Sequence, residues 1–117
     1  MKILIVDDDP GVRGLLKEFL SLHGYHTDCE TNGLDALKRM ETRGYHLLIV
    51  DYQMPQMNGI AFVKEVRRKW PFIAIIAMSL SEMERPFLEA GADLFLSKPL
   101  DLRNLKREIQ SFSRRIF

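Results

Sequence analysis

The chain has 117 residues, a length typical of one folded domain, and its 46% hydrophobic content is enough for one buried core. Its formal net charge of +1 gives no strong overall field, so composition does not favour nonspecific binding to nucleic acid. A single cysteine, Cys29, excludes an internal disulfide and a cysteine-based zinc cluster. The sequence contains no apolar run near the roughly 20 residues that span a bilayer and no signal-peptide pattern, so we expect a cytoplasmic protein without membrane insertion.

Short apolar runs alternate with longer amphipathic stretches, which is typical of a parallel sheet built from βα units. The pattern predicts strands at residues 2–6, 25–29, 46–50, 73–77 and 93–96. It predicts helices at residues 11–22, 33–42, 58–69, 82–89 and 101–115. Asp9 precedes Pro10 and Gly11, so we expect Asp9 to cap the first helix, with Pro10 at the first helical position.

The polarity of the strands indicates their order in the sheet. The runs ILIV, LLIV and FIAIIA are almost wholly apolar, as expected of central strands that helices cover on both faces, whereas YHTDC alternates with polar residues and fits an edge. We therefore predict an α/β fold of the doubly wound, flavodoxin-like (βα)5 type, in a single domain over residues 1–117. The five parallel strands take the order 2-1-3-4-5, in which the first and third flank the ligand crevice.

Carboxylates follow two of the predicted central strands. Asp7 and Asp8 come directly after the first apolar run, and Asp51 follows the third, where we expect it to be accessible to solvent and ligand. If these strands are neighbours, the carboxylates converge and repel one another unless a cation joins them. Hard oxygen ligands suit Mg²⁺, which typically takes one or two carboxylates and keeps several waters.

Two further polar groups, Ser79 and Lys98, follow the fourth and fifth strands. A hydroxyl, an ammonium and three carboxylates at one sheet edge suit a phosphoryl group, because Mg²⁺ and Lys98 would neutralise its oxygens and Ser79 would donate a hydrogen bond. Asp51 is then the expected nucleophile, since it lies centrally and a carboxylate can form an acyl phosphate.

Together these residues resemble the response regulator receiver domain of bacterial two-component signalling, and the resemblance covers essentially the whole chain. The motifs that carry it are IVDDD at 5–9, DYQMPQMNG at 51–59, Ser79, AGAD at 90–93 and SKPL at 97–100. The resemblance implies that Asp51 is the phosphoacceptor. It also implies that Asp8 binds Mg²⁺ directly, that Asp7 acts largely through water, and that the backbone carbonyl of Gln53 completes the protein ligands.

The resemblance further assigns Ser79 and Lys98 as the hydroxyl and lysine that sense the phosphoryl group. Phe95 falls where the family places an aromatic switch residue whose rotamer follows the hydroxyl, although it also fits a plain core position.

The implied partners are a sensor histidine kinase or phosphotransfer protein that donates the phosphoryl group, and a downstream protein target or a second copy of the chain. A basic face on the last helix is interpreted as solvated, so no direct contact with nucleic acid is expected. The implied protein is a switch with slow self-directed dephosphorylation and is not a metabolic enzyme.

The segment that follows Ser79 departs from the family pattern in two ways. Leu80 stands where the family usually has Ala or Gly, and its bulk is expected to crowd the phosphoryl pocket or bias the loop. The stretch up to the lysine is shorter than is usual, which predicts a shortened fourth helix. Either Ser81 and Glu84 form a capping box, leaving Pro86 deep enough to kink the helix, or the helix begins at Pro86.

Three other functions fit parts of the pattern. A haloacid dehalogenase type phosphatase also uses an aspartate nucleophile, but it needs a second acid two positions later, where this chain has Gln53. A flavodoxin-like cofactor binder needs a first loop that cradles phosphate, and DDDPG would repel it. A receiver-fold interaction module that works without phosphorylation is disfavoured by Asp51 and Lys98, whereas Leu80 leaves it open. The sequence does not decide between a stand-alone receiver and part of a longer regulator.

Overall fold

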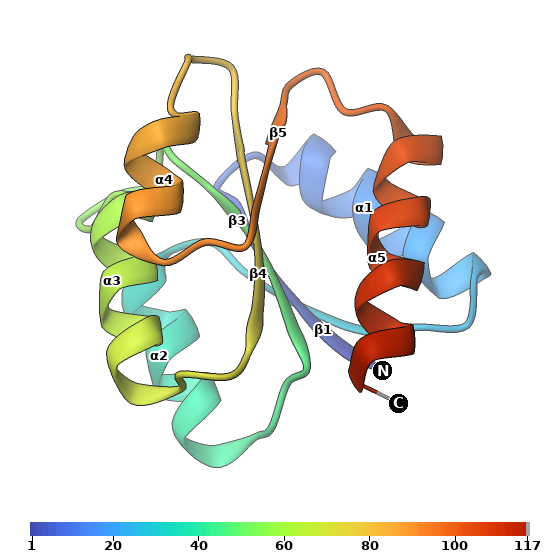
Figure 1. Ribbon diagram of the computed structural model, residues 1–117, viewed down its shortest axis with the longest axis horizontal. Coiled ribbons are helices and arrows are strands. Elements are labelled where there is room, and N and C mark those ends of the chain that lie inside the picture. Colours follow the sequence, from blue (N-terminus) through green and yellow to red (C-terminus); the bar gives the residue numbers. More distant parts are fainter. Residues whose placement is uncertain (117) are drawn as a thin grey trace.

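Five parallel, largely apolar strands form a sheet that lies between two layers of helices (Figure 1). The structure, a computed structural model, describes residues 1–116, so Phe117, the last residue of the predicted domain, lies outside the described residues. The strands are β1 Lys2–Val6, β2 His26–Glu30, β3 Leu47–Asp51, β4 Ala74–Ser79 and β5 Leu94–Ser97. The helices are α1 Pro10–Leu22, α2 Gly33–Thr42, α3 Gly59–Lys69, α4 Glu84–Ala90 and α5 Leu102–Ile116. In this part of the chain no helix combines the length and apolarity needed to cross a membrane.

The strand order is β2-β1-β3-β4-β5, which confirms the predicted doubly wound topology and the edge position of β2. β1 pairs with β3 in parallel from Ile3 opposite Leu47 to Val6 opposite Val50. The carboxyl ends of these two central strands are therefore neighbours. Ligand sites in open α/β sheets lie at such a switch point, so this register sets where the functional side chains meet.

Side chains of alternate direction along the strands form two separate cores. One face carries Ile3, Ile5, Leu47, Ile49, Ile76 and Met78, which pack against α1 and α5. The other carries Leu4, Val6, Leu48, Val50, Ile75 and Ala77, which pack against α2, α3 and α4. Figure 1 shows α1 and α5 together on one side of the sheet and the other three helices on the opposite side. Burial on both faces explains why the central strands are apolar throughout.

Strands β2 to β5 each extend further toward their carboxyl ends than the sequence pattern predicted. Asp51 pairs with Met78, and Ser79 pairs with Ser97, so both polar residues belong to the sheet. Backbone pairing does not depend on side-chain polarity, and each strand continues as long as its neighbour offers a partner. The two residues therefore lie on fixed backbone and not on loops.

Side-chain caps begin the first and third helices. Asp9 accepts a hydrogen bond from the backbone N–H of Gly11 at 2.8 Å, and Pro10 is the first residue of α1, as predicted. Asn58 caps α3 by accepting from the N–H of Ala61 at 2.9 Å. These caps fix where the β1–α1 and β3–α3 loops end, and so they define the two loops that border the carboxyl edge of the sheet.

Helix α4 has seven residues, which confirms the predicted shortening, but it begins at neither predicted residue. Met83 is its N-cap and makes no side-chain cap hydrogen bond, so the expected cap by Ser81 is wrong. Pro86 is the third helical residue, so the expected start at Pro86 is wrong as well. Proline is tolerated there because the first N–H groups of a helix have no partner within it.

Arg67 of α3 holds the opposite end of α4. Its guanidinium donates to the carbonyl of Gly91 from Nε at 3.0 Å and from Nη2 at 2.7 Å. It also donates to the carbonyls of Pro71 and Ile73, at 2.9 and 2.7 Å, and to Asp93 at 3.0 Å. Gly91 ends α4 with a φ of 119°, a left-handed conformation that favours glycine. The C-terminal end of α4 is thus bonded to the body of the domain, whereas its N-terminal end lacks a side-chain cap.

Candidate functional site

Three carboxylates converge at the carboxyl edge of the sheet. Asp7 and Asp8 follow β1, and Asp51 ends β3; each offers an oxygen, and these oxygens lie within 4.8 Å of one another. Asp7 is fully buried, whereas Asp8 is exposed. This is the convergence that the predicted strand order required. An oxygen-only donor set with one solvent-facing member fits a hard divalent cation that keeps part of its water, such as Mg²⁺.

The Asp51 side chain is less accessible than its sequence position suggested. We expected solvent exposure at the start of a loop, but the residue is 6% exposed because it is the last member of a central strand. Burial raises the pKa of Asp51, and the charge of Asp7 raises it further, while the hydrogen bond from Lys98 acts in the opposite direction. The ionised carboxylate is therefore held in a setting that favours neutralisation by an added cation.

Lys98 supplies the positive charge nearest to these carboxylates. Its Nζ lies 2.9 Å from Oδ2 of Asp7 and 3.0 Å from Oδ1 of Asp51, and its side chain is 12% exposed. Burial alone would lower the pKa of Lys98, but the hydrogen bonds and charges of its two partners outweigh burial and raise that pKa. Lys98 thus remains protonated, and its ammonium joins the ends of β1 and β3 to the loop after β5. The Lys98–Pro99 peptide bond is cis.

The remaining predicted site residues lie around this cluster. Ser79 ends β4, is 3% exposed and accepts a hydrogen bond from the N–H of Ser81 at 3.0 Å. Gln53 lies two residues beyond Asp51 on an exposed part of the β3–α3 loop. Phe95 of β5 is buried and its ring packs against that of Phe87 of α4, with the ring centres 6.0 Å apart. The roles that the resemblance gives these three residues stay predictions.

Two residues that sequence reasoning did not place at the site support its loops. Arg13 of α1 donates from Nη1 to the backbone carbonyl of Asp7 at 2.7 Å. Gly59, the first residue of α3, allows a close approach of the backbone: a Cβ there would lie 2.2 Å from the carbonyl oxygen of Asp51 and 2.9 Å from Phe87. No motif or spacing in the sequence marks Arg13 for this contact.

Comparison with known proteins identifies the relatives of the chain. The profile of the response regulator receiver domain matches residues 3–110. A CpxR homologue, a transcriptional regulatory protein of Haemophilus influenzae, is 37% identical over 117 residues, which cover 97% of this chain and 51% of that protein. The sensor histidine kinase RcsC of Salmonella typhi is 33% identical over 119 residues, which cover 99% of this chain and 13% of the kinase. The chain thus spans about half the length of such regulators and a small part of the kinase.

Solved structures agree with these sequence relatives. A two-component response regulator from Clostridium difficile superposes with a TM-score of 0.95 at 27% identity, covering 99% of this chain and 98% of that one. The response regulator TrrA from Thermotoga maritima, solved in complex with Mg²⁺ and BeF, gives a TM-score of 0.88 at 33% identity and covers 95% and 97% of the two chains. The likeness extends across the sheet and both helical layers.

Proposed function

Because the chain belongs to the response regulator receiver domain family, the phosphoacceptors of two-component signalling, we propose that Asp51 accepts a phosphoryl group from a phosphohistidine. The donor is a sensor histidine kinase or a phosphotransfer protein. The observation that carries the proposal is the place of Asp51 at the end of a central strand. Its carboxylate has an oxygen within 4.8 Å of oxygens of Asp7 and Asp8, and it lies 3.0 Å from the Nζ of Lys98. Residues 1–117 act in this proposal as one receiver unit, a switch and not a metabolic enzyme.

In the transfer step, an oxygen of Asp51 forms a bond to phosphorus while the bond from phosphorus to the histidine nitrogen of the donor breaks. The freed imidazole leaves with a proton from solvent. Asp8 would hold Mg²⁺ directly, Asp7 largely through water, and Asp51 and the Gln53 carbonyl would complete the protein ligands. Bound Mg²⁺ would offset the charge of the carboxylates and of the transferring oxygens.

Lys98 and Ser79 couple the new charge to the rest of the fold. Lys98 already bonds Asp51 at 3.0 Å, so it would exchange one carboxylate oxygen for a phosphoryl oxygen with little displacement. When the Ser79 hydroxyl turns toward the phosphoryl group, its bond from the Ser81 N–H at 3.0 Å is lost, which releases the loop before α4. Phe95 would then follow the space that the hydroxyl vacates. Such movements shift an existing equilibrium between two surfaces.

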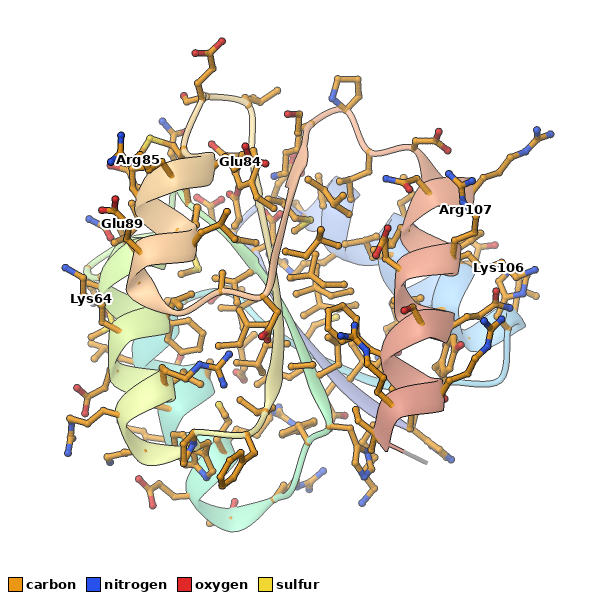
Figure 2. The ribbon with its side chains drawn as sticks, viewed as in Figure 1. Lys64, Glu84, Arg85, Glu89, Lys106 and Arg107 are labelled. Atoms are coloured by element: carbon orange, nitrogen blue, oxygen red, sulfur yellow. The ribbon has the colours of Figure 1, made fainter. Side chains whose placement is uncertain are left out.

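The surface that would change includes α4, β5 and α5. Figure 2 shows Glu84, Arg85 and Glu89 on α4, and Lys106 and Arg107 on α5. β5 is the edge strand of the sheet, and α4 and α5 cover opposite faces of it. A two-fold arrangement in which α4 of one copy faces α5 of the other would bring Glu84 and Glu89 toward Lys106 and Arg107. A second copy and a downstream protein are therefore the partners that we propose for this surface, with no direct contact to nucleic acid.

Intact-mass measurement after incubation with acetyl phosphate and Mg²⁺ tests the proposal. Wild-type protein is expected to gain the mass of one phosphoryl group, and Asp51→Asn is expected to gain none. The gain should disappear when Mg²⁺ is chelated and reappear when it is restored. Sustained turnover of a free phosphoester without a covalent adduct would instead favour a phosphatase, and an adduct on the Asn variant would place the acceptor elsewhere.

A further inference from the structure

Arg13 reaches back across the β1–α1 loop. Its Nη1 donates to the backbone carbonyl of Asp7 at 2.7 Å. That carbonyl lies one residue beyond the end of β1, whose pairing with both neighbouring strands stops at Val6. The strand ladders do not hold it, and Asp7 is fully buried, so the guanidinium supplies the partner that a buried carbonyl requires.

This bond completes the set of contacts that fix Asp7. The N–H of Asp7 donates to the carbonyl of Glu30 at 3.1 Å. Its Oδ1 accepts from the N–H of Asp9 at 2.9 Å, and its Oδ2 accepts from Lys98 at 2.9 Å. With Arg13, each polar group of Asp7 has a partner. The residue is therefore held at its backbone and at its side chain alike.

The same bond sets the direction of Asp8. A peptide unit is planar, so the carbonyl of Asp7 and the N–H of Asp8 rotate together. A guanidinium that fixes the carbonyl also fixes the plane from which the Asp8 side chain leaves the backbone. Asp8 is the exposed member of the carboxylate cluster, and packing does not hold its side chain as it holds Asp7.

We infer that Arg13 is a positioning residue for the divalent metal, acting through the Asp7–Asp8 peptide; the inference rests on the proposed function. The positive charge of Arg13 by itself would affect Mg²⁺ affinity in the opposite direction to this positioning. A cation beside a metal site repels the metal, so removing its charge alone would tighten Mg²⁺ binding. Loss of the bond frees the peptide plane and weakens binding, as happens when groups that orient metal ligands are removed.

Titration of the protein with Mg²⁺ alone, followed by calorimetry and by the amide NMR signals of Asp8 and Tyr52, separates these effects. Arg13→Met keeps the apolar stem and removes both the charge and the donors, and it is expected to raise the Kd about tenfold. Lys17→Met is the matched control, because Lys17 is an exposed cation one turn further along α1. Its Kd should stay unchanged or fall slightly. Arg13→Lys keeps the charge and one donor, so its Kd should rise less.

A second readout separates positioning from damage to the fold. At saturating Mg²⁺ the Arg13→Met protein is expected to take up beryllofluoride to the same extent as wild type, because excess metal restores the geometry. An unchanged or lower Kd in Arg13→Met would overturn the inference, as would uptake that saturating Mg²⁺ does not restore or a Kd for Arg13→Lys at least as high as for Arg13→Met. Wild-type protein that binds Mg²⁺ but accepts no phosphoryl group would refute the proposed function and leave this test intact.

Discussion

Replacing Lys98 with methionine removes the ammonium that joins Asp7 and Asp51 while it retains most of the side-chain volume. In the metal-free protein this leaves two buried carboxylates facing each other. Breaking a buried ion pair by removing one partner typically costs about 3–5 kcal/mol. Protonation limits that loss: the ordinary pKa of aspartate is 3.8, and a pKa unit corresponds to about 1.4 kcal/mol, so neutralising one carboxylate at pH 7 caps the cost at about 4 kcal/mol.

This upper limit on the lost unfolding free energy becomes smaller as the pH is lowered, which makes the prediction specific. At pH 5 the same reasoning limits the loss to less than about 2 kcal/mol. Urea unfolding of wild type and Lys98→Met at the two pH values measures both losses. Mg²⁺ should recover part of the stability at pH 7, because it returns positive charge to the cluster. Combining Lys98→Met with Asp51→Asn should also recover part of it, because one of the unpaired charges is gone.

An exposed lysine provides the control for the loss of charge. Lys64→Met, on the outer face of α3 (Figure 2), is expected to change the unfolding free energy by no more than about 0.5 kcal/mol at either pH. A loss for Lys98→Met that is equally large at pH 5 and pH 7 would show that packing, and not charge, makes Lys98 necessary. That result would refute the electrostatic account of the cluster.

Three further predictions follow from the same geometry. Because the pKa of Asp51 is raised in the folded state, the stability of the metal-free protein declines as the pH rises from about 4 through the folded-state pKa. Asp51→Asn should therefore stabilise the protein more at pH 7 than at pH 4, as measured by urea unfolding. An equal gain at both pH values would contradict this. Gly59→Ala, whose Cβ would overlap the Asp51 carbonyl, should lower the unfolding free energy by about 2–3 kcal/mol or more. Gly14→Ala, with open space around the added Cβ on α1, should raise it by about 0.5–1 kcal/mol. Equal effects of the two substitutions would refute the steric argument. Leu80→Ala should change the rates of phosphoryl uptake and hydrolysis measured by mass, with little change in stability because Leu80 is 80% exposed; unchanged rates would remove Leu80 as a kinetic determinant.

The sheet order and the meeting of the carboxylates could be predicted because both depend on signals that lie in consecutive residues. Apolar runs mark strands that are covered on both faces, and the polar edge strand β2 differs visibly from them. Once β1 and β3 are neighbours, the residues after their carboxyl ends must lie close together. The convergence of Asp7, Asp8 and Asp51 therefore follows from the topology alone and requires no knowledge of any side-chain contact.

Other features depend on contacts between distant residues and leave little trace in the sequence. The apolar pattern ends before Asp51, but the ladder continues because β4 offers a backbone partner at Met78. The start of α4 was misplaced because Met83 caps it without the side-chain bond by which caps are recognised. Arg13 was missed because a donor to a backbone carbonyl requires only a long side chain in reach, which no spacing rule marks.

The unequal attachment of α4 determines how this element can respond to a change at the site. At its C-terminal end the Arg67 guanidinium donates hydrogen bonds to the carbonyls of Gly91, Pro71 and Ile73. At its N-terminal end Met83 provides no side-chain cap. A helix that is hydrogen-bonded at its C-terminal end and uncapped at its N-terminal end can pivot about the bonded end, so its displacement grows toward the N-terminal end. With only seven residues, the helix has little length in which to absorb bending. A displacement that began beside Ser79, as the proposed function requires, would therefore turn the whole helix and would be greatest at Glu84.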